Sequence, residues 1–117
     1  MKHIFIVDDN HDDLLFMTMA LERAGYKVRQ FDNAAAAIES IPQFKPDIYV
    51  TDVSLPEVDG AESLRKIKKL YPQLPVIAVS AYRQYLNNME DLGAAAVCCK
   101  SLDHANLLSA IKKVESD

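Results

Sequence analysis

Four apolar runs of the sequence each stop at a polar side chain that can do chemistry. These side chains are Asp8 with Asp9, Asp52, Ser80 and Lys100. If the runs are parallel strands, their carboxyl ends meet at one edge of a sheet, where ligands bind in open α/β folds. Crowded carboxylates repel one another unless a positive charge lies between them, and Mg²⁺ prefers such oxygen ligands while keeping several waters. The set therefore indicates a magnesium-assisted phosphate chemistry.

A carboxylate, a cation, a lysine and a hydroxyl are the parts needed to accept a phosphoryl group on an aspartate, because that chemistry is mostly positioning and neutralisation of oxygen charges. In this interpretation Asp52 is the nucleophile and also a metal ligand. Asp9 binds Mg²⁺ directly and Asp8 through a water, while Lys100 and the Ser80 hydroxyl hold phosphoryl oxygens. The simpler alternative is that the acids and the lysine only solubilise loops and that Ser80 is a turn or cap residue.

The elements that must position these residues can be predicted from the apolar pattern. Continuous apolar or β-branched runs predict five strands, and stretches with helical periodicity predict five helices alternating with them. Short connections between strands and helices imply right-handed crossovers and a parallel sheet covered on both faces. We therefore expect one doubly wound α/β domain. The expected strands are 3–7, 28–31, 46–52, 75–79 and 95–99.

Local signals set the expected helix ends. Asn10 or His11 can cap the first helix and Asn33 the second, which Pro42 is expected to close. The third helix begins at Asp59 or Gly60 and ends near Tyr71 and Pro72. A fourth helix is expected over 83–92, ended by Gly93, although its apolar stripe is modest. The last helix is expected to be capped by Asp103 and to run through Val114.

Composition excludes several classes of protein. The 117 residues form a single domain with a formal net charge of −4, which argues against direct nucleic-acid binding. The apolar runs are far shorter than the roughly 20 residues that span a bilayer, and no signal peptide is recognisable, so a cytoplasmic protein is expected. Cys98 and Cys99 point to opposite faces of a strand, which favours two small buried side chains over a metal or redox site.

Taken in order, the motifs resemble the receiver domain of bacterial two-component response regulators. The match covers nearly the whole chain, and its strength comes from the complete set at receiver spacing. The segments that carry it are Ile6-Val7-Asp8-Asp9, Pro46-Asp47-Ile48, Asp52 to Gly60, Val79-Ser80-Ala81, Gly93-Ala94 and Lys100.

The resemblance implies a flavodoxin-like sheet of strand order 2-1-3-4-5. It also implies that a histidine kinase or histidine phosphotransfer protein donates the phosphoryl group to Asp52, and that the Ser54 backbone carbonyl completes the protein ligands of Mg²⁺. Phosphorylation would then draw Ser80 toward the phosphate and reshape the surface of the fourth helix, fifth strand and fifth helix. A downstream protein, or a second copy in a homodimer, would bind that surface.

Two positions depart from the family pattern. Val97 stands where an aromatic residue usually precedes the lysine by three positions, and Ser101 stands where a proline usually follows it. An ordinary aromatic switch is therefore not expected. A cis peptide after Lys100 is not expected either, because without proline it costs about 2.5 to 4 kcal/mol.

These departures favour an alternative function, a degenerate receiver that acts as a phosphate-independent interaction module. The intact Asp8, Asp9, Asp52 and Lys100 oppose it. A hydrolase with an aspartate nucleophile would need an Asp-x-Asp pair that the sequence lacks, and no glycine-rich phosphate loop indicates a nucleotide enzyme. We expect a signalling domain over 1–117 with no output domain and no enzymatic role beyond weak autophosphorylation from phosphodonors and self-dephosphorylation.

Overall fold

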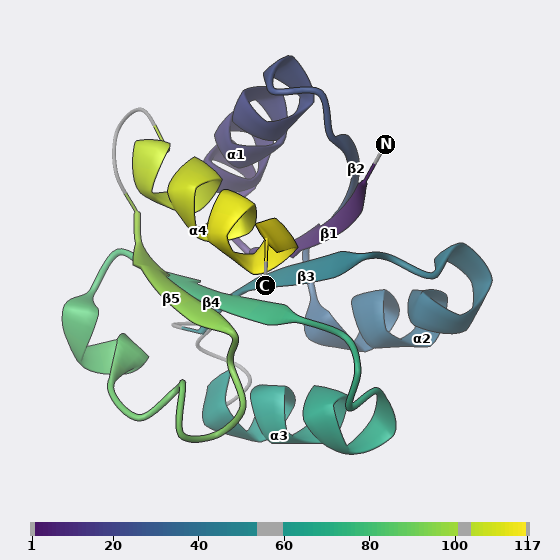
Figure 1. Ribbon diagram of the computed structural model, residues 1–117, viewed down its shortest axis with the longest axis vertical. Coiled ribbons are helices and arrows are strands. Elements are labelled where there is room, and N and C mark those ends of the chain that lie inside the picture. Colours follow the sequence, from purple (N-terminus) through teal and green to yellow (C-terminus); the bar gives the residue numbers. More distant parts are fainter. Residues whose placement is uncertain (1, 54–59, 101–103, 117) are drawn as a thin grey trace.

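The sheet has the strand order that the family resemblance implies. The computed structural model describes residues 2–53, 60–100 and 104–116. Its five strands are all parallel and lie in the order β2-β1-β3-β4-β5, with β3 in the centre and β2 and β5 at the edges (Figure 1). The strands are β1 (His3–Val7), β2 (Lys27–Phe31), β3 (Ile48–Asp52), β4 (Val76–Ser80) and β5 (Ala96–Cys99).

The register brings the expected site residues to one edge of the sheet. Val7 of β1 lies opposite Thr51 of β3, so the next residues along the two strands, Asp8 and Asp52, lie side by side. On β4, Ser80 lies opposite Cys99, the last residue of β5, and Lys100 follows. The prediction that these strands end at a common polar edge is confirmed.

Helices cover both faces of the sheet, as predicted. Figure 1 shows α1 (His11–Arg23) and α4 (Ala105–Ser116) on one face, and α2 (Ala34–Phe44) and α3 (Gly60–Leu70) on the other. Two apolar clusters fill these layers. The first includes Leu14 and Met17 of α1 with Leu107 and Ile111 of α4. The second includes side chains of α2 and α3, so that the central strands are buried on both faces, as is usual in parallel sheets.

Side-chain caps begin the first two helices as the sequence suggested. The Asn10 side chain accepts a hydrogen bond from the Asp13 amide at 2.9 Å, and the Asn33 side chain accepts one from the Ala36 amide at 2.8 Å. Each cap satisfies one amide that would otherwise lack a partner at a helix start. The expected Asp103 cap lies outside the described residues.

The prediction that Pro42 closes the second helix was wrong. Pro42 lies inside α2, which continues to Phe44 and ends at Lys45 in the left-handed conformation. The Lys45 amide still bonds to the Ile41 carbonyl at 2.8 Å. The extra turn lets the Phe44 ring pack against Phe5 and under the Arg29 guanidinium, contacts that offset the amide lost at the proline.

The prediction of a helix over 83–92 was also wrong. The segment forms one 3-10 turn, η1 (Arg83–Leu86), followed by hydrogen-bonded turns. Asn88 has a φ of 67°, which interrupts any continuous right-handed helix, and Leu86 and Met89 still reach the core. Leu86 and Met89 supply the buried apolar side chains of this segment without a continuous helix, so packing does not require a full helix.

Candidate functional site

The side chain of Lys100 gathers three carboxylates at the polar edge of the sheet. Its Nζ atom lies 2.6 Å from Oδ2 of Asp52, 2.7 Å from Oδ2 of Asp8 and 2.8 Å from Oδ2 of Asp13. Asp8 follows β1, Asp52 ends β3, Asp13 lies in the first turn of α1 and Lys100 follows β5. Residues from four separate parts of the chain thus meet at one ammonium group, as the strand-end argument predicted for three of them.

Burial makes these charges interact strongly. The Asp8 side chain is fully buried, that of Asp52 is 4% exposed and that of Lys100 is 12% exposed. Burial would by itself lower the pKa of Lys100, but the hydrogen bonds that the ammonium donates to Asp13, Asp52 and Asp8 outweigh it and raise that pKa well above its ordinary value. The lysine is therefore a permanent cation in this site.

For Asp8, in contrast to Lys100, the surroundings favour the uncharged form, because the carboxyl group is buried and lies beside a second acid. Burial raises its pKa to about 6, and the neighbouring Asp52 adds to the increase, although hydrogen bonds from Lys100 and the Asn10 amide oppose it. The Asn10 amide donates to Oδ1 at 2.9 Å, which leaves Oδ2 facing Lys100. The site holds more negative charge than one lysine can neutralise, which favours binding of a further cation.

Ser80 lies at the same edge and is completely buried. Its backbone carbonyl accepts the Lys100 amide at 2.9 Å, and its Oγ atom accepts the Tyr82 amide at 3.0 Å. The second contact is the turn role that we weighed as the simpler alternative. The strand register nevertheless keeps the hydroxyl beside the end of β3, since Asp52 lies opposite Val79.

The donor set fits a hard divalent cation. Asp8 and Asp52 both direct Oδ2 to a single cationic nitrogen, so both carboxylates already converge on one positive position. Asp9 is exposed and follows directly, while Ser54, the other expected ligand, lies outside the described residues. Within the described part of the chain, no group of three His, Cys, Asp or Glu side chains is arranged to hold a metal ion. Mg²⁺ usually keeps several waters and needs only one or two carboxylates from the protein.

Sequence reasoning missed Asp13. An acid in the first turn of α1 favours the start of the helix, but Asp13 is also the third carboxylate on Lys100. The sequence did carry a signal for Asp13. A helix that begins directly after a strand places its first turn at the same edge of the sheet, so an acid in that turn can lie at the site. Which of the first-turn acids would face the site could not be read from the sequence. Asp12 is exposed, whereas Asp13 is half-buried.

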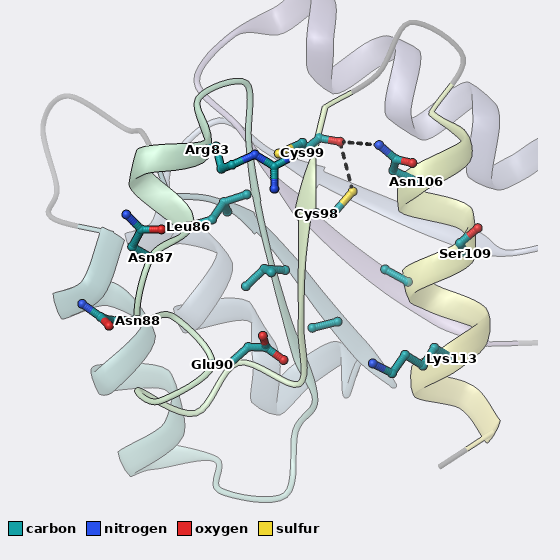
Figure 2. A pocket seen from close by; sticks show the side chains of 13 residues that line it. Arg83, Leu86, Asn87, Asn88, Glu90, Cys98, Cys99, Asn106, Ser109 and Lys113 are labelled. Atoms are coloured by element: carbon teal, nitrogen blue, oxygen red, sulfur yellow. Dashed lines mark hydrogen bonds between the residues drawn. The ribbon is translucent and has the colours of Figure 1, made fainter.

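Beside the site, the face of β5 carries a cavity of about 690 Å³. Figure 2 shows that residues 83–90 form one wall, α4 forms the other and β5 lies between them. Arg83 and Glu90 line the first wall and Lys113 the second. Cys99 lies at its upper end, where its carbonyl accepts a hydrogen bond from Asn106 of α4. The surface that we expected from a fourth helix, fifth strand and last helix is therefore a groove flanked by turns and α4.

The site and the fold define a response regulator receiver domain, and the chain belongs to that family. The family model matches residues 4–112. The chain is 31% identical over 116 residues to the response regulator receiver protein CpdR of Brucella abortus, covering 97% of each. It is 33% identical over 110 residues to the DNA-binding transcriptional regulator NtrC of a Bradyrhizobium species, covering 92% of this chain but only 23% of that relative.

A solved structure shows the same fold. The response regulator TrrA of Thermotoga maritima, crystallised in complex with Mg²⁺ and beryllium fluoride, aligns with a TM-score of 0.89 over 97% of this chain and 99% of its own at 24% identity. Receiver domains are signalling domains of two-component systems, so the predicted family and fold are confirmed. Over the described residues, every helix is too short or too polar to cross a membrane.

Proposed function

We propose that the protein is a phosphorylation-dependent switch in a two-component phosphorelay and that Asp52 is its phosphoacceptor. The observation that carries the proposal is the contact of the buried Asp52 carboxylate with the Lys100 ammonium, beside the equally buried Asp8. A carboxylate in contact with a fixed cation is suited to attack phosphorus, because the same cation then holds the transferred group.

The reaction transfers a phosphoryl group from a phosphohistidine of a histidine kinase or histidine phosphotransfer protein. A carboxylate oxygen of Asp52 attacks phosphorus, the O–P bond forms, and the N–P bond breaks. The departing imidazole takes its proton from solvent. Lys100 and the Ser80 hydroxyl hold phosphoryl oxygens, so both residues would exchange part of their present contacts for the new group.

Mg²⁺ would be held by Asp9, by Asp52 and by the Ser54 backbone carbonyl, with Asp8 acting through a water. When bound, it neutralises negative charge on the carboxylates and on the phosphoryl oxygens. The buried, highly acidic surroundings of Asp8 support this assignment, since the pKa of Asp8 is raised to about 6 chiefly by burial and further by Asp52.

We propose that the phosphodonor protein docks on α1. This helix begins at the site and carries three large, half-exposed apolar side chains close together, Leu15, Phe16 and Met19, with exposed fractions of 48%, 53% and 46%. Apolar side chains gathered on a surface mark interaction sites. Their place next to the start of α1 suits a partner that must present a phosphohistidine to Asp52.

The output surface in this proposal is the groove over β5. It begins at the strand that leads into Lys100, so a change in the contacts of Lys100 and Ser80 reaches it directly. A downstream protein binds there after phosphorylation. A homodimer through the same surface is the other arrangement of this kind, and the mass of the phosphorylated protein by light scattering distinguishes the two.

One observation favours a phosphate-independent interaction module instead. Val97 is half-buried and packs against the cluster under α2 and α3, so it cannot swing as an aromatic side chain would. A partner that binds equally well to the wild type and to Asp52→Ala would support this second function.

We also propose that the protein is cytoplasmic and that it signals rather than catalyses a reaction on a substrate. Cys98 and Cys99 are free thiols, which suits the reducing cytoplasm that we propose as its compartment. The chain would act as a signalling protein whose own activity is limited to slow phosphorylation by small phosphodonors and slow loss of the group. It has no direct role in binding nucleic acid or membranes.

The deciding experiment is intact mass spectrometry after incubation with Mg²⁺ and acetyl phosphate, beside Asp52→Ala. We expect one added phosphoryl group that requires Mg²⁺ and is absent from the variant. A wild-type protein that never gains mass and never binds beryllium fluoride would falsify the switch and leave the phosphate-independent module.

A further inference from the structure

All of the hydrogen-bonding capacity of the Lys100 ammonium is in use. A lysine ammonium has three N–H donors, and Nζ of Lys100 contacts three carboxylate oxygens, those of Asp52, Asp8 and Asp13. An oxygen of a phosphoryl group on Asp52 therefore gains a full hydrogen bond from Lys100 only if another acceptor gives way.

The three acceptors differ in what the proposed reaction does to them. Asp52 becomes the phosphoacceptor, so its contact with Lys100 passes to the phosphoryl group that it carries. Asp8 and Asp9 are assigned to Mg²⁺, which would neutralise the charge of Asp8. Asp13 has neither role: it lies on α1, its side chain is 37% exposed, and its only recorded ion pair among the described residues is the 2.8 Å contact with Lys100.

We propose that Asp13 is a positioning residue that competes with the phosphoryl group for the Lys100 ammonium and thereby lowers the occupancy of the phosphorylated state. The inference rests on the proposed function. Asp13 acts in two ways that have the same sign. It retains one of the three lysine donors, and it places a negative charge next to the position where a doubly charged phosphoryl group must form.

The direction of the effect separates this role from a structural one. If Asp13 only anchored Lys100 or stabilised the start of α1, its removal would weaken the site. If it competes, its removal strengthens binding of a phosphoryl group or of an analogue. Because the side chain is partly exposed, solvent screens its charge, and we expect a change of roughly three- to tenfold.

The test compares Asp13→Asn with Asp12→Asn. Asp12 is the neighbouring first-turn acid, so both variants remove one negative charge and the same favourable interaction with the helix N-terminus. Asp12 is exposed and takes no part in the ion pairs of Lys100. The measurement is the apparent dissociation constant of beryllium fluoride at saturating Mg²⁺ by ¹⁹F NMR, together with the fraction phosphorylated by acetyl phosphate from intact mass.

We expect Asp13→Asn to bind the analogue about three- to tenfold more tightly and to reach a higher phosphorylated fraction, while Asp12→Asn stays within about twofold of the wild type. Equal or weaker binding by Asp13→Asn would overturn the proposal, as would an equal gain in Asp12→Asn, which would show a general charge effect. Failure of the wild type itself to take up either probe would instead reject the proposed function. Asp13→Glu, which keeps the charge, should move back toward the wild type.

Discussion

Asp8 and Asp52 both accept hydrogen bonds from the Lys100 ammonium, whose Nζ atom lies 2.7 Å from Oδ2 of Asp8 and 2.6 Å from Oδ2 of Asp52. The parallel register of β1 and β3 sets these two carboxylates side by side, and the end of β5 brings the lysine to them. The pair would be strongly repulsive without a cation, since both side chains are almost fully buried. Lys100 is therefore a structural counter-ion as well as a candidate for binding phosphoryl oxygens.

This arrangement predicts that Lys100→Met destabilises the fold and that Mg²⁺ restores part of the loss. The substitution keeps an unbranched side chain that is one atom shorter but leaves three carboxylates without their shared cation. We expect the free energy of unfolding to fall by about 3 to 5 kcal/mol at neutral pH in EDTA, as for one broken buried ion pair. Urea denaturation with EDTA and with Mg²⁺ measures both values.

The matched control for this experiment is Lys113→Met on α4. Lys113 is exposed and makes none of the ion pairs recorded among the described residues. Its substitution should change stability little and should not respond to Mg²⁺ differently from the wild type. Equal losses in the two variants would contradict the counter-ion role of Lys100.

The second prediction concerns pH. Burial, reinforced by Asp52, raises the pKa of Asp8 from 3.8 to about 6. Between these two values the folded protein binds more protons than the unfolded chain, so this group makes the free energy of unfolding fall as pH rises from about 4 to 6. Its stabilising contribution is complete below pH 4 and lost above pH 6. The size is about 3 kcal/mol, since each pKa unit corresponds to about 1.4 kcal/mol.

Asp8→Asn removes this titration, so the stability difference between the wild type and the variant should change with pH across that range in EDTA. Asp9→Asn provides the comparison, because it removes an exposed carboxylate from the next position. Denaturant titrations at pH 4, 5, 6 and 7 give the four differences. A constant difference between the wild type and Asp8→Asn would show that Asp8 does not titrate there.

Much of the fold and site could be predicted because strand ends are marked in the sequence. The sequence changes abruptly from apolar Val7 to Asp8, and the apolar run of β3 ends at a single acid, Asp52. Both acids lie at the polar edge of the sheet, as these patterns predict. Asp13 could not be assigned in this way, since its role depends on the direction of a long lysine side chain from the far end of the sheet. The prediction of a helix over 83–92 was wrong for a related reason. The buried side chains of Leu86 and Met89 can reach the core from a helix or from turns.

The third prediction tests the docking surface on α1. Leu15→Ser should slow phosphoryl transfer from the partner protein by about tenfold, because fully burying a leucine side chain under a partner contributes about 1.5 to 3 kcal/mol. Its rate with acetyl phosphate should not change. Leu70→Ser is the matched control, since Leu70 is an equally exposed leucine at the end of α3. Stopped-flow or quench-flow transfer assays with the isolated partner measure the rates.

Equal slowing of Leu15→Ser and Leu70→Ser would indicate a general effect of losing surface leucine and reject α1 as the docking surface. Slowing with acetyl phosphate as well would place the defect in the site itself. Only a selective loss with the protein donor agrees with the proposal.

The last prediction concerns the unexpected end of α2. Lys45 adopts a φ of 47° and closes the helix in the left-handed conformation, which glycine adopts without the steric cost borne by a side chain. Lys45→Gly should therefore raise the free energy of unfolding by about 0.5 to 1 kcal/mol, whereas Lys45→Ala, which removes the same charge but keeps the Cβ atom, should not. Thermal and urea unfolding of the three proteins decide the matter. If glycine and alanine have the same effect, the charge of Lys45 and not its backbone conformation sets the stability of this helix end.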